Sequence, residues 1–252
     1  MKVIVCVKQI PDPATPYRLE EGSNWLIRPE EQILDDTDRY GVEMGLQIAQ
    51  ATDGTVTVVS MGPSGTGQGI RQALAMGADD AILIEDGSLR GSDALTTARV
   101  LAAAIGRNDF DLVIAGTEST DGYSGVVPQM LAEILGVPAL TYATEVDTGD
   151  GSVTIHRQTA AGYDIVTADL PAVVSVTAGV VEPRYPTFKG IMDAKKKPIE
   201  TLSMGDLGAK RAPEQLVLSI VDAPERTAGR KIEDDGEAHQ AIISLLTERK
   251  VI

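Results

Sequence analysis

The sequence predicts an α/β protein built on a doubly wound, mostly parallel sheet, and three observations support this fold class. Short apolar runs alternate with helix-like segments over roughly residues 1–140, which is typical of strand–helix–strand units around a parallel sheet. Hydrophobic residues make up 43% of the chain but aromatic residues only 4%, so Val, Ile, Leu and Ala must form the core. The length of 252 residues suits one large domain, or one domain with an extension.

The first half of the chain supplies the alternating elements. Asp35–Asp38 offers a cap for the first helix, and Ser92 or Asp93 for the third, because short polar side chains accept hydrogen bonds from free N–H groups at a helix start. Residues 18–26 predict a small hairpin or loop. Expected strands cover residues 3–7, 55–61, 81–84 and 111–115, and expected helices cover 38–51, a stretch through Ile70 and Leu74 to Met76, 92–105 and 125–135.

The second half departs from this alternation. Residues 153–158 alternate between apolar and polar, and residues 163–167 can pair with them as an added hairpin. Further strands are expected at 172–176 and 216–221, and a last helix at 238–249. The polar stretch 223–237 between them is too long for an ordinary loop of a compact domain. We therefore expect a nucleotide-binding domain over residues 1–200 and a C-terminal arm over residues 201–252.

Charge and cysteine content exclude several classes of protein. The formal net charge is -15, which disfavours nucleic acid and anionic membranes as partners, because both need a basic surface. The first apolar run reaches Lys8 too early for a signal peptide or a membrane span, so a cytoplasmic protein without membrane insertion is expected. The single cysteine, Cys6, excludes an internal disulfide and predicts a buried, inert thiol.

A glycine-rich loop between an expected strand and an expected helix is a candidate phosphate site. Glycines allow close backbone approach to a ligand, and free N–H groups at the helix start attract anions. The loop could meet Pro63-Ser64 and the end of the first strand beyond the carboxyl edge of the sheet. It matches neither the P-loop nor the G-x-G-x-x-G pattern, and a turn that merely needs glycines is the alternative. The residues are Gly116, Thr117, Glu118, Ser119, Thr120, Asp121, Gly122, Tyr123, Ser124, Gly125, Val126 and Val127.

Catalytic constellations are largely missing from the sequence. His156 and His239 have no neighbouring His or Cys, which disfavours a metal site, and there is no G-x-S-x-G motif. The cluster Asp35, Asp36 and Asp38 could bind Mg²⁺ or a ribose, but its place at a helix start fits capping equally well. A nucleotide fold without catalytic groups indicates binding, relay or regulation, so no enzyme activity is expected of the chain alone.

A basic segment near residue 190 has the composition of an interface. Between Arg184 and Lys197 there are five basic residues and one acidic residue, Asp193, inside a strongly acidic chain. Phe188, Ile191 and Met192 lie among these charges, and an apolar anchor with a positive rim suits an acidic partner. The alternative is an amphipathic helix packed on its own domain with solvated lysines.

These residues resemble the electron transfer flavoprotein β-subunit family, and the resemblance covers nearly the whole chain. The basic segment contributes Glu182-Pro-Arg-Tyr185, Ile191-Met192, Ala194-Lys-Lys-Lys197 and Ile199-Glu200. Elsewhere the matching residues are Val7-Lys8-Gln9, Pro11-Asp12, Val42-Glu43, Gly62-Pro63, Ala73–Asp79, Asp111-Leu-Val-Ile114, Leu170–Val174 and Arg226–Gly229.

The resemblance implies an adenine-nucleotide α-hydrolase-like fold and a heterodimer with an α subunit. FAD is then held mainly by, or shared with, the α subunit, and AMP is bound by this chain. The implied AMP contacts are Cys6, Asp35, Asp36, Thr37, Asp38, Met61 and the loop Gly116–Val127. The implied recognition loop, residues 181–200, docks acyl-CoA and related dehydrogenases, and electrons pass on to a quinone oxidoreductase. Its docking residues are Arg184, Tyr185, Phe188, Lys189, Ile191, Met192, Lys195, Lys196 and Lys197.

The sequence departs from the family pattern at a few positions. Asp35-Asp36-Thr37 replaces a common Asn-Pro-Phe, Phe188 replaces a common Leu, Asp193 replaces a frequently basic residue, and Pro13 replaces an aromatic residue. Two alternatives stay open. An electron-bifurcating relative would bind a second FAD in the AMP position, and a universal-stress-type regulatory module would bind ATP as a homodimer.

Overall fold

The computed structural model describes residues 1–29, 31–63, 67–208, 215–221, 223–224, 228–229, 231–234 and 236–252. Contacts divide this part of the chain into two units, Met1–Leu218 and Ser219–Ile252. Ser64, Arg226 and Thr227, named above from sequence, lie outside the described residues.

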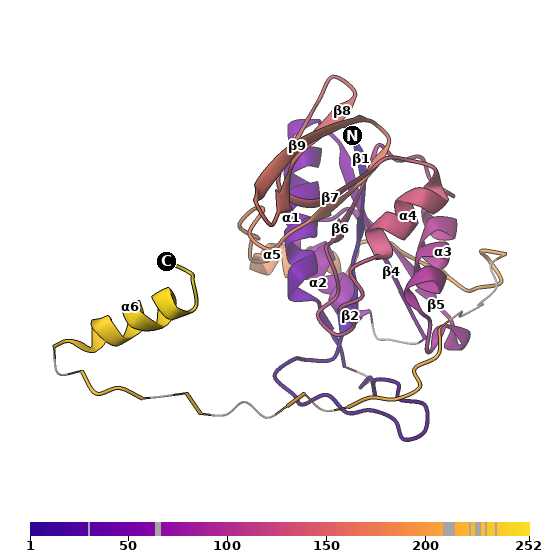
Figure 1. Cartoon of the computed structure of the whole chain (residues 1–252). Coiled ribbons are helices and arrows are strands. Elements are labelled where there is room, and N and C mark those ends of the chain that lie inside the picture. The colour runs from indigo at the N-terminus through magenta and orange to yellow at the C-terminus, as the bar shows by residue number, and fades with distance from the viewer. Residues whose placement is uncertain are drawn as a thin grey trace. The chain divides into compact units, whose positions relative to one another are not determined.

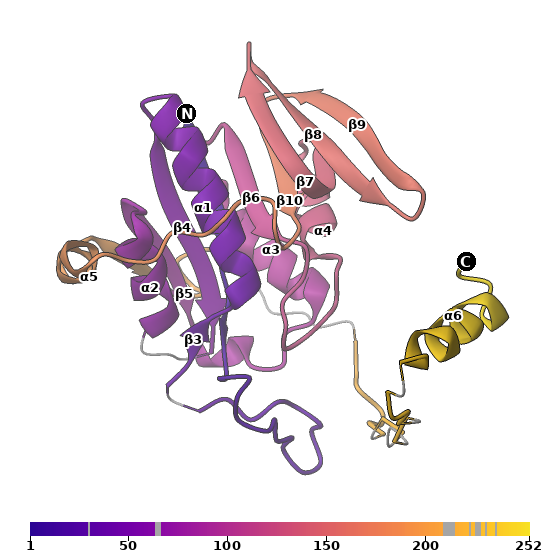
Figure 2. The same cartoon turned by 90° about the vertical axis from the view of Figure 1, so that its left-hand side faces the viewer.

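A nine-stranded sheet forms the centre of the first unit, in the order β11-β5-β4-β1-β6-β10-β7-β8-β9. All neighbours from β11 to β7 run parallel, while β8 and β9 add an antiparallel ribbon to β7 (Figure 2). The doubly wound, mostly parallel fold with an added hairpin is thereby confirmed. The strands are β1 (Lys2–Cys6), β4 (Thr55–Gly62), β5 (Asp80–Glu85), β6 (Leu112–Gly116), β7 (Ala139–Gly149), β8 (Ser152–Thr159), β9 (Gly162–Asp169), β10 (Ala172–Val176) and β11 (Ile199–Leu202).

Helices cover both faces of the parallel part of the sheet (Figure 1). On one face lie α1 (Asp36–Ala51), α2 (Gln68–Met76) and α5 (Phe188–Ala194), and on the other lie α3 (Ala94–Ile105) and α4 (Val127–Leu135). A short 3-10 turn, η1 (Gly87–Leu89), precedes α3. Each face has its own apolar cluster, so central strands are buried on both sides and read as continuous apolar runs.

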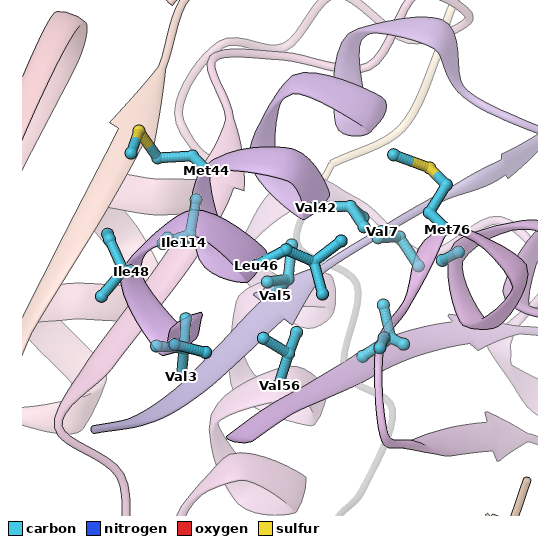
Figure 3. Packing of buried hydrophobic residues seen from close by; sticks show 14 of the residues in the cluster. Val3, Val5, Val7, Val42, Met44, Leu46, Ile48, Val56, Met76 and Ile114 are labelled. Carbon is cyan, nitrogen blue, oxygen red and sulfur yellow. The ribbon is translucent and has the colours of Figure 1, made fainter. Parts of the chain in front are cut away.

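The packing between α1 and the sheet uses small branched side chains. Figure 3 shows Leu46 of α1 over Val5 of β1, with Val3 and Val56 beside them. Alternate residues of β1, such as Ile4, join the cluster on the opposite face. A core of Val, Ile, Leu and Ala is therefore observed, as the low aromatic content predicts.

Several elements differ from the sequence-based expectation. The eleven-residue strand β7 was not anticipated, because its outer half alternates Thr, Glu and Asp with small residues and gives no continuous apolar run. Residues 216–221 were expected to form a strand, which is wrong: they are exposed and adopt no regular structure. Without sheet neighbours, β-branched residues alone do not form a strand. Residues 18–26 do form a small hairpin-like loop, closed by a bridge between Leu19 and Leu26, and the short pair β2 (Gln9–Ile10) and β3 (Ile33–Leu34) flanks that excursion.

The second unit contains the terminal helix α6 (Ala238–Glu248), which confirms the helix expected there. None of its residues is buried, and Ile242, Ile243 and Leu245 are exposed. The expected domain boundary after residue 200 falls inside β11, whereas contacts divide the chain after Leu218. Among the helices of the described residues, none combines the length and apolarity that crossing a bilayer requires.

Candidate nucleotide site and docking segment

The strand order reverses around β1, and three loops meet at the carboxyl ends of the strands there. The chain leaves β1 toward β4 and β5 on one side and later returns to its other side as β6. Ligands of open α/β sheets bind at such a switch point. The loops that meet there follow β1, precede α1 and follow β6, and they contain most of the nucleotide-binding residues expected from sequence.

Asp35 ties the start of α1 to the glycine-rich loop. Its buried carboxylate accepts hydrogen bonds from the Thr37 amide at 3.1 Å and the Thr120 amide at 2.7 Å. The hydroxyls of the same two threonines donate to it at 2.9 and 3.0 Å. Asp35 is thus the N-cap of α1, and the capping interpretation is confirmed for this residue. The Thr120 amide is therefore engaged by Asp35.

Asp38 lies one turn into α1 and faces the end of β1. It is buried and accepts a hydrogen bond from the Lys8 amide at 2.6 Å. Burial raises the pKa of this carboxyl well above its ordinary value, and the nearby Asp35 charge adds to the rise. A Cβ atom on Gly116 would lie 2.8 Å from the Asp38 carboxyl oxygen, so this close approach requires glycine at the end of β6. Asp36, by contrast, is largely exposed beside Arg39.

Asp121 is the centre of an ion-pair network within the loop. Its buried side chain pairs with Lys8 Nζ at 2.6 Å and with the Arg28 guanidinium. Lys8 Nζ also donates to the Ser119 hydroxyl at 3.2 Å. Burial would raise the pKa of Asp121, but the Lys8 and Arg28 charges more than offset this and hold it below its ordinary value. The network joins the loop both to the end of β1 and to the excursion that contains Arg28.

Sequence reasoning missed Lys8 and Arg28 as residues of this site. Lys8 lies two residues after the end of the buried strand β1, and that position could have been recognised as the carboxyl edge of the sheet. Arg28 is separated from Asp121 by 93 positions in an irregular segment, so no spacing in the sequence relates the two.

The N-terminus of α4 offers the remaining N–H groups. Its first turn follows Gly125, whose φ of 64° is left-handed, and Val126 supplies no side-chain cap. Val126, Val127 and Gln129 carry the amides of this first turn, since Pro128 has no N–H, and uncapped amides at a helix start attract anions. Tyr123 beside it is largely exposed and also left-handed, with φ 47°. The turn expected from sequence is observed here, and the phosphate site stays a prediction.

The other expected nucleotide contacts lie at strand ends. Cys6 is buried at the end of β1, and burial raises the pKa of its thiol to about 12, so the thiol is neutral and unreactive. Met61 is half-buried near the end of β4. Thr117 donates from its hydroxyl to the Val176 carbonyl at 3.0 Å, which fixes the loop to β10. No group of three or more potential metal ligands gathers in the part of the chain that the structure describes.

The basic segment forms the short helix α5, capped by Thr187, whose side chain accepts from the Gly190 amide at 3.0 Å. Phe188 is 82% exposed and Tyr185 80% exposed, and Ile191 and Met192 are also exposed. Lys189, Lys195 and Lys196, close to them in the sequence, are exposed as well. An amphipathic helix packed on its own domain is observed, since Ala194 is buried against α2, yet this helix also presents an apolar surface.

Two of the five basic residues are engaged within the chain. Arg184 forms an ion pair with the buried Glu43 of α1, with 2.6 Å between Nε and the carboxylate. Lys197 donates to three main-chain carbonyls at the end of α2. The positive rim around Phe188 therefore consists of Lys189, Lys195 and Lys196.

This fold and these two regions define an α/β protein with a glycine-rich loop at its switch point and an exposed short helix near three lysines. Residues 24–207 match the family model described as the electron transfer flavoprotein domain. The chain belongs to the electron transfer flavoprotein family.

Curated relatives match along the whole chain. The chain is 40% identical to the electron transfer flavoprotein subunit beta of Mycobacterium tuberculosis (strain ATCC 25618 / H37Rv), with 99% of each chain covered. It is 34% identical to the protein of the same name from Megasphaera elsdenii, over 100% of this chain and 98% of the relative. It is also 31% identical to the caffeyl-CoA reductase-Etf complex subunit CarD of Acetobacterium woodii, over the full length of both chains.

Proposed function

We propose that this chain is the β subunit of a heterodimeric electron transfer flavoprotein. In this function it holds AMP at the switch point and docks acyl-CoA-type dehydrogenases through α5. The FAD held by the α subunit then accepts electrons and relays them to a quinone oxidoreductase. The cytoplasm is the proposed location.

The exposed helix α5 is the observation that carries the docking function. A side chain the size of Phe188 at 82% exposure is unfavourable in a free subunit, and it suits a partner pocket. Lys189, Lys195 and Lys196 around it would attract an acidic surface and speed association. The rest of the chain carries a strong negative charge. That charge repels an acidic partner from other surfaces and directs it to this segment.

The geometry around Asp35 supports an adenine nucleotide at the switch point. The α4 N-terminus offers amides to a phosphate, while four hydrogen bonds from Thr37 and Thr120 to the Asp35 carboxylate reduce its repulsion of an anion. AMP fits because one phosphate needs one helix N-terminus.

The bound nucleotides test this proposal directly. The chain is co-expressed with the α subunit of the same organism, the complex is purified, and released nucleotides are identified after denaturation. We expect a single FAD and a single AMP in each heterodimer. Two FAD and no AMP would instead favour an electron-bifurcating complex.

A homodimer that binds ATP and does not associate with the α subunit would contradict the proposal. That result belongs to the regulatory module considered from sequence, which the family match does not support.

A further inference from the structure

The docking helix is held to the domain at both ends, by a contact with α1 before it and a contact with α2 after it. Glu43 lies in the middle of α1 and is 3% exposed. Arg184 lies 141 positions later in the sequence, just before the turn that leads into α5. The two residues join a helix of the nucleotide domain to the start of the docking segment.

The Glu43 carboxylate is fully used by this contact. Arg184 donates to it from Nε at 2.6 Å, from its terminal nitrogen at 2.9 Å and from its main-chain amide at 3.2 Å. Gln47 adds a fourth hydrogen bond at 2.9 Å. Burial alone would raise the pKa of Glu43, but these hydrogen bonds hold it below its ordinary value. The two-pronged geometry fixes both the position and the orientation of the Arg184 side chain and, through its amide, of the backbone.

The far end of the segment is fixed in another way. Lys197 Nζ donates to the carbonyls of Leu74 at 3.0 Å, Gly77 at 3.2 Å and Ala78 at 2.5 Å, at the negative end of α2. Between the two ends, a Cβ atom on Gly190 would lie 2.5 Å from the Ala75 carbonyl oxygen. The helix α5 therefore rests directly on α2, and only its outward side chains remain available.

We infer that Glu43 is a positioning residue for partner docking: by gripping Arg184 it sets the place and direction from which α5 presents Phe188 and its lysine rim. The inference rests on the proposed docking function of α5. The buried Glu43 carboxylate of α1 thereby controls the affinity for a dehydrogenase that it does not contact. A pre-ordered docking helix loses less conformational freedom on binding, and this strengthens association.

The experiment uses the complete heterodimer and an acyl-CoA dehydrogenase preloaded with its substrate as the electron donor. Glu43→Gln keeps the shape of the side chain but removes its charge, and Arg184→Lys keeps the charge but removes the two-pronged contact. Asp109→Asn is the control, because Asp109 forms a 3.3 Å ion pair with Lys2 that involves no residue of α1, α2 or α5. KM for the dehydrogenase, kcat, flavin content and the rate of flavin reduction by dithionite are measured for each.

We expect Glu43→Gln and Arg184→Lys each to raise KM by about fivefold or more, with kcat, flavin content and dithionite reduction unchanged. The Asp109→Asn variant should retain the wild-type KM. In a Phe188→Ala background, Glu43→Gln should change KM by less than about twofold, because residues that act through the same contact are not additive. Arg184→Lys provides the test if Glu43→Gln does not fold.

Two failures are distinguishable. If Phe188→Ala leaves KM unchanged, α5 is not the docking site and the proposed function itself is overturned on that point. If Phe188→Ala raises KM while Glu43→Gln and Arg184→Lys do not, only the positioning role is overturned. Fully additive effects of Glu43→Gln and Phe188→Ala, or a loss of flavin content, would also overturn it, because either result shows that Glu43 acts elsewhere in the fold.

Discussion

Three carboxylates (Asp35, Asp38 and Asp121) and two cations (Lys8 and Arg28) meet at the switch point. How they pair determines the net charge that a ligand meets there. Asp121 is balanced by Lys8 and Arg28, and Asp35 receives four hydrogen bonds. Burial shifts Asp38 toward its neutral form. Of the two acidic residues that replace Asn-Pro, Asp35 is therefore held by hydrogen bonds that reduce its repulsion of a phosphate. Asp36, the exception, is largely exposed to water, where its charge is screened.

The Asp121 network gives a prediction about stability and pH. Asp121→Asn leaves Lys8 and Arg28 without their counter-charge, and we expect the free energy of unfolding to fall by about 1–3 kcal/mol at pH 7. Because the folded-state pKa of Asp121 lies below its ordinary value, the ionised carboxylate stabilises the fold above the ordinary pKa. That contribution disappears as the pH falls through the folded-state pKa.

Urea unfolding of the wild type and of Asp121→Asn across the pH range is the measurement. The difference between them should be constant from pH 7 to about pH 5 and shrink below the ordinary aspartate pKa of about 3.9. A difference that grows as the solution becomes more acidic would contradict the assigned pairing.

At the scale of elements, α5 depends on the helix beneath it. Lys197 caps the last carbonyls of α2 with its ammonium group, so it belongs to the support of the docking segment. The neighbouring Lys196 is exposed and belongs to the rim around Phe188. Two adjacent lysines of the same run thus have different structural environments.

Replacing each of these lysines separates the two environments. Lys197→Met keeps the length of the side chain but removes the charged donor, and we expect it to lower the free energy of unfolding by about 1–2 kcal/mol. Lys196→Met is the control, with an expected change within about 0.5 kcal/mol. Equal stability losses for both variants, measured by urea unfolding, would show that Lys197 does not cap α2.

The elements that could be predicted from sequence are those with a strong local pattern. The boundaries of β10 were predicted without error, and α1, α3 and α6 within about two residues of their observed starts, because buried apolar runs and Asp caps are local signals. The strand β7 escaped prediction because its outer half is stabilised by pairing with β8, which is a tertiary effect. The strand predicted at residues 216–221 is absent for the opposite reason, since these residues have a strand-like composition but no neighbouring strand.

The residues of the candidate site also fall into those that could be predicted from sequence and those that could not. The glycine-rich loop and Asp35 could be recognised because their residue types are set by backbone geometry and capping. Arg28, Glu43 and the internal role of Arg184 and Lys197 could not, because these contacts join residues far apart in the chain. The lysine run is uniform in sequence, and only the end of α2 distinguishes Lys197 from the lysines before it.

At the scale of the whole molecule, the two units differ in how they are stabilised. Among the described residues, every buried hydrophobic side chain lies at or before Met204. The unit Ser219–Ile252 has an amphipathic helix, but none of its described residues is buried. Such a segment needs a partner surface to cover Ile242, Ile243 and Leu245, and we propose that it is the arm that wraps the α subunit.

Deleting residues 219–252 tests this proposal. The truncated chain should keep its urea unfolding midpoint, since it retains the complete core, but its affinity for the α subunit should fall by at least tenfold, about 1.4 kcal/mol. Both quantities are measured on the purified subunits, with full-length chain as the reference. Unchanged affinity for the α subunit would show that this segment is not the wrapping arm.

Electron transfer from an acyl-CoA dehydrogenase to the heterodimer tests the central claim most directly. The second-order rate constant for flavin reduction is compared between the wild type, Phe188→Ala and Ile165→Ala, a control that removes an equally apolar, 65% exposed side chain from β9. Losing an interface anchor costs about 2 kcal/mol, so we predict a fall of roughly 30-fold for Phe188→Ala, no change for Ile165→Ala and intact heterodimers throughout. A wild-type rate constant for Phe188→Ala would contradict the account of this chain as the docking subunit.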